Sequence, residues 1–478
     1  MLRDYQSLGI DDLRSVYSSG ARSALYVLPT GGGKTTVFTE IARLAVERGK
    51  RVCVLAHRRE LVDQASKRLD SFEIPHGIIA AGMNRSEIPH GITVASVQTL
   101  VRRTVDPFDL IIIDEAHHAP AGSWAKVIAA NPGAKVLGVT ATPCRLDGKG
   151  LAASFEHLVM GPNYSALIAE GFLTDADVYA PHVPDMSAAK ARGGDYAAED
   201  VADVMERPKV TGDVVDHYLR LGAGKRAVAF CAGVRHAEAV AAAFIAAGVP
   251  AACVHGGLDA DVRADRIADL EAGRILVLTA ADLISEGFDL PAIEVAIMLR
   301  PTKSLSLYLQ QVGRALRPAP GKIRALVLDH AGNVHRHGFP TQDREWTLDG
   351  GAVARVPADP SGDAEIQIRQ CPQCYRIHRP SRTCPACGYV YVAKDKIPKY
   401  VEGDLIAIQR RDKAALKAVV AARSISAERF RKEGWRAESM AELLRCAERH
   451  GRSQGEAWQY AKWMASKNHR IRGYSGPS

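Results

Sequence analysis

The stretch ALYVLPTGGGKTT at residues 24–36 decides the fold. An apolar segment without alternation, typical of a strand buried on both faces, runs into three glycines and then into a helical pattern over 36–46. Successive glycines let backbone N–H groups point inward at the start of a helix, where the dipole favours an anion. Lys34 would reach the β- and γ-phosphates and Thr35 would offer a hydroxyl to Mg²⁺. The stretch predicts a nucleotide-phosphate loop, although Leu28 stands where the strict pattern G-x-x-x-x-G-K-[ST] has its first glycine.

A second stretch, LIIIDEAHH at residues 110–118, supplies two acids at the end of an apolar strand. We expect Asp114 to face Mg²⁺ and Glu115 to activate the attacking water. The alternative is that the two acids are simply solvated at the end of a strand. The Gly-Lys-Thr loop upstream in the same block makes this interpretation weaker. His117 either couples the nucleotide to the next motif or caps the turn, and His118 is interpreted as structural.

Short apolar runs alternate with helical stretches over the first ~150 residues and again from about residue 210 to 345. This pattern predicts an α/β fold with two tandem domains, each a parallel sheet flanked by helices. A polar, Gly-containing segment without periodicity separates the two blocks. The expected division is a nucleotide-binding domain at 1–180, a linker at 181–209, a second domain at 210–345, a four-cysteine module at 365–395 and a basic helical region at 396–478.

Composition bounds the class of protein. The 478 residues are 47% hydrophobic and 24% charged, ordinary values for a globular protein of about three domains. No apolar run approaches the ~18 residues of a membrane span, and the N-terminus lacks the pattern of a secretory signal. We therefore expect a cytoplasmic protein without membrane partners.

The net charge of +8 is unevenly distributed. Residues 361–478 hold 23 basic and 12 acidic residues, whereas residues 1–360 hold 39 basic and 42 acidic ones. A neutral body with a cationic C-terminal quarter favours a polyanionic partner, although a solvated basic surface is the common alternative.

A series of short motifs runs in order across both blocks. The first block holds RDYQ (3–6), PTGGGKT (29–35), AHRREL (56–61) with Gln64, ASVQT (95–99), DEAHH (114–118) and TATP (140–143). The second block holds FCA (230–232), HGG (255–257), SEGFDLP (285–291) and QQVGRALR (310–317). In this order, over about residues 1–345, they resemble the motifs of superfamily 2 helicases of the DEAD/DEAH type.

This resemblance implies two RecA-like domains that hydrolyse ATP with Mg²⁺ in the cleft between them. It implies that Gln6 reads adenine, that AHRREL and ASVQT track a nucleic-acid strand, and that TATP relays the nucleotide state between domains. The implied nucleotide-binding residues are Arg3, Gln6, Thr30, Gly31, Gly32, Gly33, Lys34, Thr35, Thr36, Asp114, Gly287, Asp289, Arg314 and Arg317. The expected catalytic residues are Lys34, Asp114, Glu115, Arg314 and Arg317.

The two arginines of QQVGRALR add positive charge that could stabilise the transferred phosphoryl group. Arg314 and Arg317 lie one helical turn apart and share a face that can point at the nucleotide. An arginine that stabilises a transferring phosphoryl group is worth about 10³–10⁵ in rate. Because these arginines belong to the other domain from Lys34, closure of the cleft would complete the site. The alternative interpretation is that the two arginines belong to a solvated basic face of a helix.

Four cysteines form the pattern C-x₂-C-x₉-C-x₂-C, at Cys371, Cys374, Cys384 and Cys387. Two such knuckles deliver four thiolates to a tetrahedral Zn²⁺. The alternative is a redox-active C-x-x-C motif, but a redox role does not explain why the chain has two such motifs. The pattern therefore predicts structural zinc with no open ligand position. The remaining cysteines are expected to be buried thiols: Cys53, Cys144, Cys231, Cys253 and Cys446.

The chain beyond residue 390 is basic with interleaved aromatics, which could contact phosphates and stack on bases. Trp458 and Trp463 fit the core of a small helical domain equally well. Two helicase domains, a four-cysteine cluster and this helical tail resemble the RadD type of bacterial and phage DNA-repair helicases. That resemblance implies a protein encoded by a bacterium or a phage that works on single-stranded or branched DNA, with a single-stranded-DNA-binding protein as a partner.

The sequence thus predicts an ATP-dependent DNA helicase or translocase. Three alternatives stay open: an RNA helicase, a zinc-bearing nucleic-acid-binding scaffold with a vestigial ATPase, and the motor of a restriction-type nuclease. The intact lysine, acid pair and arginines argue against the scaffold. A nuclease would have to be a separate subunit.

Overall fold

The computed structural model describes most of residues 2–391. The described residues are 2–57, 59–86, 88, 91–118, 122–145, 150–180, 184, 186, 189, 191–192, 195–196, 201, 205, 208–281, 293–349 and 368–391. Three predictions lie outside them: the basic helical region at 396–478, the thiol of Cys446, and the SEGFDLP motif with Gly287 and Asp289.

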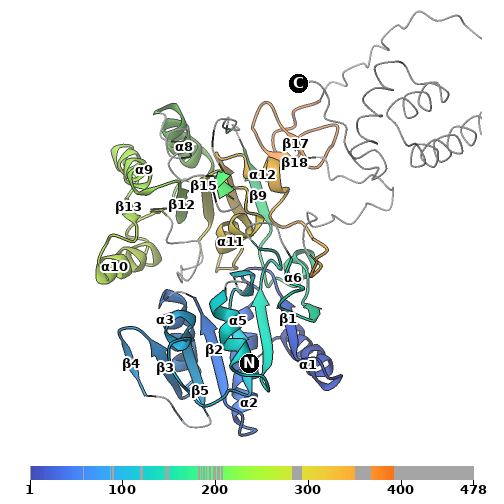
Figure 1. Cartoon of the computed structure of the whole chain (residues 1–478). Helices are drawn as coiled ribbons and strands as arrows, with labels where there is room; N and C mark the ends of the chain where they lie inside the picture. Colours follow the sequence, from blue (N-terminus) through green and yellow to red (C-terminus); the bar gives the residue numbers. More distant parts are fainter. Residues whose placement is uncertain are drawn as a thin grey trace, which may run out of the picture. The chain divides into compact units, whose positions relative to one another are not determined.

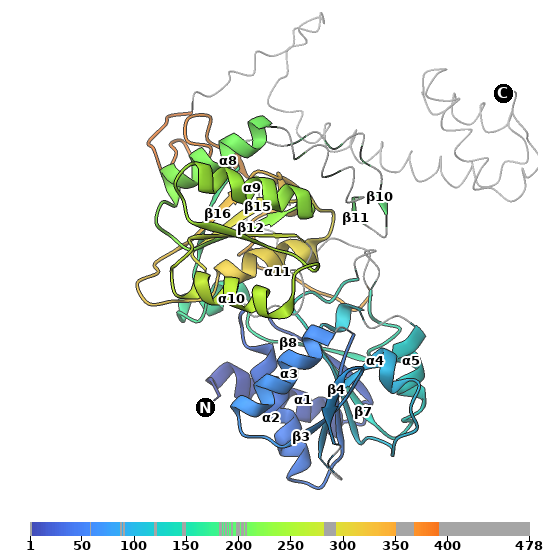
Figure 2. The same ribbon diagram turned by 90° about the vertical axis from the view of Figure 1, so that its left-hand side faces the viewer.

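The first domain is a sheet with helices on both faces (Figures 1 and 2). Among the described residues its strand order is β4-β3-β5-β2-β6-β7-β1-β8, parallel except for the pairing of β3 with β4. The strands are β1 (Ser23–Val27), β2 (Val52–Ala56), β3 (His76–Ala80), β4 (Met83–Arg85), β5 (Ile92–Ser96), β6 (Leu110–Ile113), β7 (Lys135–Thr140) and β8 (His157–Met160). Figure 2 shows α1 (Asp4–Ser18), α2 (Lys34–Val46) and α3 (Arg59–Ser71) on one face, with α4 (Val97–Leu100) and α5 (Gly122–Ala129) on the other.

Burial explains why these strands lack an alternating pattern. Every residue of β1, β2 and β6 is buried, because helices cover both faces of the sheet. Tyr26 and Val54 point into the core beneath α1 to α3, whereas Leu25 and Leu55 point into the core that holds Trp124 of α5. The central strands are thereby fixed, and so are the loops at their carboxyl ends, where ligands bind in parallel sheets.

The second domain repeats this architecture with the strand order β13-β14-β12-β15-β16-β9, all parallel in the described residues. The strands are β9 (Ala176–Tyr179), β12 (Ala227–Cys231), β13 (Ala251–Val254), β14 (Val277–Ala281), β15 (Val295–Leu299) and β16 (Ala325–Asp329). Figure 2 shows α8 (Pro208–Leu221) and α9 (Val234–Ala246) on one face, with α10 (Ala260–Glu271) and α11 (Leu305–Ala315) on the other. Shorter elements are η1 (Ala116–His118), α6 (Tyr164–Ala169), β10 (Ala191–Arg192), β11 (Asp195–Tyr196) and α12 (Asn333–His337).

One expected boundary differs from the structure. The sequence placed residues up to 180 in the first domain, but β9 pairs with β16 and completes the edge of the second sheet. The chain therefore reaches the second domain before the expected linker at 181–209. The partner strand lies almost 150 residues further along the chain, and such a pairing leaves no local pattern in the sequence.

The four-cysteine module lies against this edge strand. It contains β17 (Arg369–Gln370) paired with β18 (Ile377–His378), and Arg376 forms a bridge with Tyr179 of β9. Arg376 also pairs with Asp177 at 2.5 Å, and the Ala180 amide donates to the Tyr375 carbonyl at 3.2 Å. The module thus covers the edge of the second sheet and belongs to the same compact unit as both sheets.

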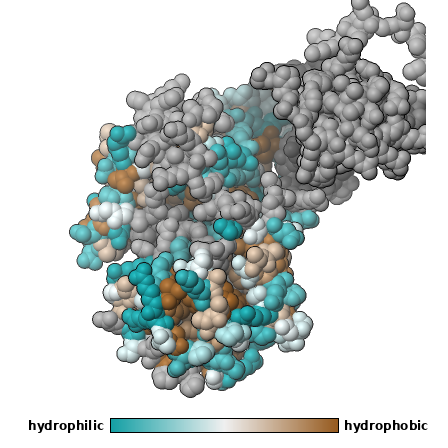
Figure 3. All heavy atoms as spheres, in the orientation of Figure 1, coloured by the Kyte–Doolittle hydropathy of each residue, from teal (hydrophilic) through white to brown (hydrophobic). Residues whose placement is uncertain are grey.

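Among the described residues, no helix is both long and apolar enough to cross a membrane. The coloured surface in Figure 3 mixes hydrophilic and hydrophobic residues over the first domain.

Candidate active site

The phosphate loop connects β1 to α2, as the sequence predicts. Gly31 and Gly33 have φ of +86° and +89°, in the left-handed region that glycine adopts readily, and α2 begins at Lys34. A Cβ on Gly33 would lie 2.4 Å from Nε2 of Gln6. Any larger residue at this position would therefore both strain the backbone and displace Gln6.

The RDYQ segment at the start of α1 packs directly on this loop. The hydroxyl of Tyr5 donates to the Gly32 carbonyl at 2.7 Å, and the Gln6 amide approaches the same oxygen at 3.4 Å. The Gln6 Oε1 atom accepts from the backbone N–H of Arg3 at 3.0 Å. Residues about 30 positions apart in the chain thus form one surface around the loop.

A cavity of about 490 Å³ opens beside the glycines. Its lining comprises Arg3, Gln6, Gly31, Gly33, Thr36, Arg68, Ser71 and Phe72. The Arg68 guanidinium stacks over the Phe72 ring at 4.6 Å and donates to Thr36 Oγ1 at 3.1 Å. Sequence reasoning missed Arg68 and Phe72, because they come from the end of α3 and belong to no motif.

The acid pair follows β6. Burial, together with the charge of Glu115, raises the pKa of Asp114 to about 7, and the Lys34 ammonium opposes this shift. Glu115 adopts φ of +46°, an uncommon value for a residue with a side chain, and its Oε2 atom is buried without a hydrogen bond. A water molecule or cation would satisfy this carboxylate, so the acid pair fits a metal-assisted phosphate reaction.

His117 links the acids to the TATP motif. Its Nδ1 atom lies 3.1 Å from Thr140 Oγ1 and 3.4 Å from Glu115 Oε2, in a fully buried position. Of the two interpretations, coupling to the next motif is the one these contacts favour over a simple turn cap.

Helix α11 of the second domain brings the QQVGRALR motif against the phosphate loop. A Cβ on Gly313 would lie 2.5 Å from the Thr30 Cβ, and a Cβ on Gly31 would lie 3.5 Å from Cγ of Arg317. The Thr174 amide donates to the Leu316 carbonyl at 2.8 Å just beyond the helix. The structure therefore places the Arg317 stem beside the phosphate loop of the other domain.

The two motifs expected to track a strand also lie together. The Gln98 amide donates to the His57 carbonyl at 2.7 Å, and the Ser96 hydroxyl donates to Gln98 Oε1 at 2.7 Å. His57 follows β2, Ser96 ends β5 and Gln98 comes just after it, and these two strands are neighbours in the first sheet. The FCA and HGG motifs likewise occupy the carboxyl ends of β12 and β13.

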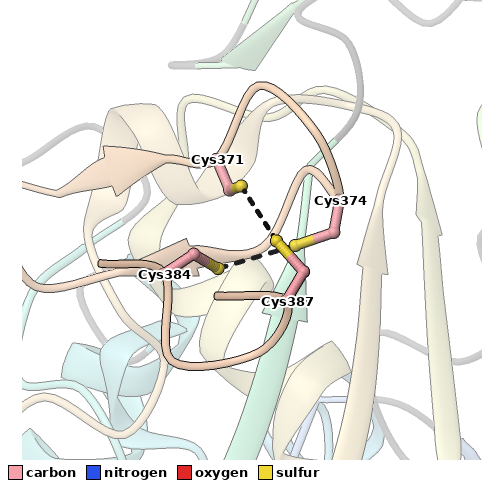
Figure 4. Close-up of side chains that lie close together, drawn as sticks. All are labelled: Cys371, Cys374, Cys384 and Cys387. Atoms are coloured by element: carbon pink, nitrogen blue, oxygen red, sulfur yellow. Dashed lines mark hydrogen bonds between the residues drawn. The ribbon is translucent and has the colours of Figure 1, made fainter. Parts of the chain in front are cut away.

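The four cysteines of the C-terminal module converge (Figure 4). Their sulfur atoms all lie within 4.8 Å of one another, with Cys371 and Cys387 at 3.6 Å and Cys374 and Cys384 at 3.7 Å. Four sulfurs at ~2.3 Å from a tetrahedral zinc are about 3.8 Å apart, so the cluster is compatible with Zn²⁺. Burial opposes ionisation of Cys371, but the backbone N–H groups of Cys374 and Gln373 lower its pKa to about 6.

Two family models match the two sheets. The description "Type III restriction enzyme, res subunit" matches residues 1–145, and "Helicase conserved C-terminal domain" matches residues 211–319. These two matches, together with the paired RecA-like domains and the motifs they carry, identify the class: the chain belongs to the superfamily 2 helicases, which are nucleic-acid-dependent ATPases.

Individual relatives extend this assignment. A "51.5 kDa protein" of a Lactococcus phage is 32% identical over 81% of this chain and 83% of its own length. The "Putative ATP-dependent helicase IRC3" of Saccharomyces cerevisiae is 28% identical over 70% of this chain, which spans about half (52%) of that relative. The "DNA 3'-5' translocase XPB2" of Sulfurisphaera tokodaii is 29% identical over 31% of this chain and 32% of its own length.

A solved structure has the same fold. The Type ISP restriction-modification enzyme LlaBIII, bound to DNA, superposes with a TM-score of 0.53 at 17% identity, over 68% of this chain and 27% of that one.

Proposed function

We propose that this protein is a DNA translocase or helicase that couples hydrolysis of Mg²⁺-bound ATP to movement of its two RecA-like domains. The observation that carries the proposal is the packing of α11 on the phosphate loop. Gly313 lies against Thr30, and Arg317 lies beside Gly31 of the other domain. An ATPase site built from both domains responds to their relative position, which is what a motor requires.

The residues of the site then take the following proposed roles. Lys34 and the glycine N–H groups bind phosphate oxygens, whereas Thr35 and Asp114 hold Mg²⁺, which supplies charge neutralisation when bound. Glu115 orients the attacking water, and Arg314 and Arg317 stabilise charge on the transferred group. Gln6 and Arg3 line the cavity that would receive the base. Gly287 and Asp289 complete the proposed set.

DNA is the proposed track, in preference to RNA. The relative named as a DNA translocase is matched over 31% of this chain, whereas relatives named as RNA helicases are matched over 17–19%. The basic C-terminal quarter would add contacts to phosphates.

A role in repair or recombination, in the manner of the RadD type, is the finer part of the proposal. It is supported by the order of two motor domains, a four-cysteine cluster and a basic tail. A single-stranded-DNA-binding protein would be the partner, and co-elution with the purified full chain tests that interaction.

ATP hydrolysis by the full chain tests the central proposal. The rate is measured alone and with single-stranded, duplex and forked DNA and with RNA, beside Lys34→Ala. We expect stimulation by DNA that disappears in the variant. Displacement of a third strand from duplex DNA then reports translocation without requiring strand separation.

Other outcomes would redirect the proposal. Stimulation by RNA alone would assign the motor to RNA. Hydrolysis that no nucleic acid stimulates would remove the motor function as stated and favour the scaffold.

A further inference from the structure

A buried polar cluster joins the DEAHH and TATP motifs of the first domain to Ser306, a residue of the second domain that belongs to no motif. The hydroxyl of Thr142 donates to Ser306 Oγ at 2.7 Å, and Ser306 Oγ lies 3.4 Å from Nε2 of His117. Ser306 belongs to α11, whereas Thr142 and His117 belong to the first domain. All three side chains are at most 3% exposed, so water does not compete for these contacts.

The donors and acceptors form one continuous chain. With the His117 proton on Nδ1, that N–H faces Thr140 Oγ1, and the Thr140 hydroxyl donates to the Thr142 carbonyl at 3.0 Å. The Thr142 hydroxyl donates to Ser306, whose own proton then faces His117 Nε2. The same His117 Nδ1 lies 3.4 Å from Glu115 Oε2. A chain of polar atoms therefore runs from the water-activating acid to the first turn of α11.

Helix α11 connects this cluster to the segment that holds the arginines. Ser306, Gln310 and Gly313 follow one another at spacings of four and three residues, which places them on one face of α11. Arg317 comes two residues after the helix ends at Ala315. At ~1.5 Å per residue, Ser306 lies about 12 Å along the axis from Arg314. One end of this face contacts His117 and Thr142, and the other contacts Thr30 and Gly31.

We propose that Ser306 is a positioning residue that couples Glu115 to the arginine-bearing helix. This inference rests on the proposed function. When Glu115 takes up its partners in the loaded site, the His117 contact changes, and the Ser306 hydroxyl transmits that change to α11. Ser306 touches neither the nucleotide nor the reacting atoms.

A neighbouring serine separates this role from helix stability. The Ser304 side chain caps α11 by accepting from the Leu307 amide at 3.2 Å, and it contributes nothing to the cluster. Ser304→Ala therefore removes a hydroxyl whose hydrogen bond lies within the first turn of α11. It is the matched control.

The experiment measures kcat and KM for ATP, with and without single-stranded DNA, in the full chain. The variants are Ser306→Ala, Thr142→Val and their double, with Ser304→Ala and Thr142→Ser as controls. Ser306→Ala and Thr142→Val are each expected to lower the DNA-stimulated kcat about tenfold, with KM changed less than about threefold. The double variant is expected to lower kcat no further than either single variant, because both substitutions break the same Thr142–Ser306 hydrogen bond.

Ser304→Ala should lower the melting temperature by ~2–4 °C and keep kcat within about twofold. Thr142→Ser should also keep kcat within about twofold, because it retains the hydroxyl.

Retention of kcat within twofold in Ser306→Ala would overturn the inference, as would a double variant that loses the product of the two single effects. Equal losses in Ser304→Ala and Ser306→Ala would also overturn it, since helix stability would then explain both. If the wild type is not stimulated by DNA, the proposed function fails instead, and the same comparisons on the basal kcat still decide the role of Ser306.

Discussion

The first domain holds its proposed phosphate- and metal-binding groups in loops that follow strands β1 and β6, whereas the second domain holds its proposed arginines in helix α11 (Arg314) and two residues beyond its end (Arg317). In the first domain the proposed phosphate ligands are backbone N–H groups, in a loop whose glycines adopt φ of +86° and +89°. In the second domain, long side chains reach across a contact between domains. The loops depend on local backbone geometry, and the arginines depend on how closely two domains approach.

The largest expected effect comes from the loop itself. Lys34→Ala should lower ATP hydrolysis on the order of 10³-fold or more, because the proposed role of its ammonium is to stabilise negative charge on the phosphate oxygens during transfer. The melting temperature should stay close to that of the wild type. Lys50→Ala, which removes a surface pair with Asp109 at 3.1 Å, is the control and should keep full activity. Substantial hydrolysis by Lys34→Ala would show that this loop is not the catalytic one.

The second-largest effect on ATP hydrolysis is expected from the arginines. Arg317→Ala is expected to lower kcat about 10²–10³-fold with a smaller change in KM, since the guanidinium acts on charge that develops during the reaction. Arg317→Lys should not restore the rate, because an ammonium lacks the planar pair of donors. Steady-state kinetics measure this effect, with Arg274→Ala, which removes an exposed ion pair with Asp269 at 2.6 Å, as the control. Restoration by lysine would indicate a simple charge effect.

The contact between domains can be tested without removing any charge. Gly313→Ala adds a Cβ only 2.5 Å from the Thr30 Cβ, so α11 must move away from the phosphate loop. We expect kcat to fall about 10–10²-fold, as misplacement of a catalytic group by ~1 Å commonly does. Gly233→Ala, where a Cβ meets no atom within 4 Å, is the matched control. Equal rates for the two variants would mean that this contact does not contribute to catalysis.

The smallest effect on hydrolysis is expected at the four-cysteine module. The wild type should hold one zinc per chain by elemental analysis, and Cys371→Ser with Cys384→Ser should lose it. The melting temperature should fall by several degrees, because the module covers β9, while hydrolysis stays within about threefold. Cys144→Ser, outside the cluster, should keep both zinc and stability. Full zinc retention by the double variant would refute the four-thiolate site.

Part of this site could be read from the sequence because its signals are local. The glycines before Lys34, the acids after β6 and the paired cysteines each depend on residues a few positions apart. The structure confirms two parallel sheets flanked by helices and the convergence of the four sulfurs. The roles of Lys34, Asp114 and the arginines stay predictions until kinetics test them.

The amino-acid sequence by itself thus determined the class of protein, the loop that would bind phosphate and the cysteine ligands, because short-range backbone and ligand geometry leave a pattern along the chain. Only the tertiary structure decided that β9 completes the second sheet, that Arg68 and Phe72 line the cavity, and that Ser306 meets Thr142. These contacts join residues more than 30 and up to about 160 positions apart. Their formation depends on how sheets and helices pack, and packing leaves no repeating signal in any one segment.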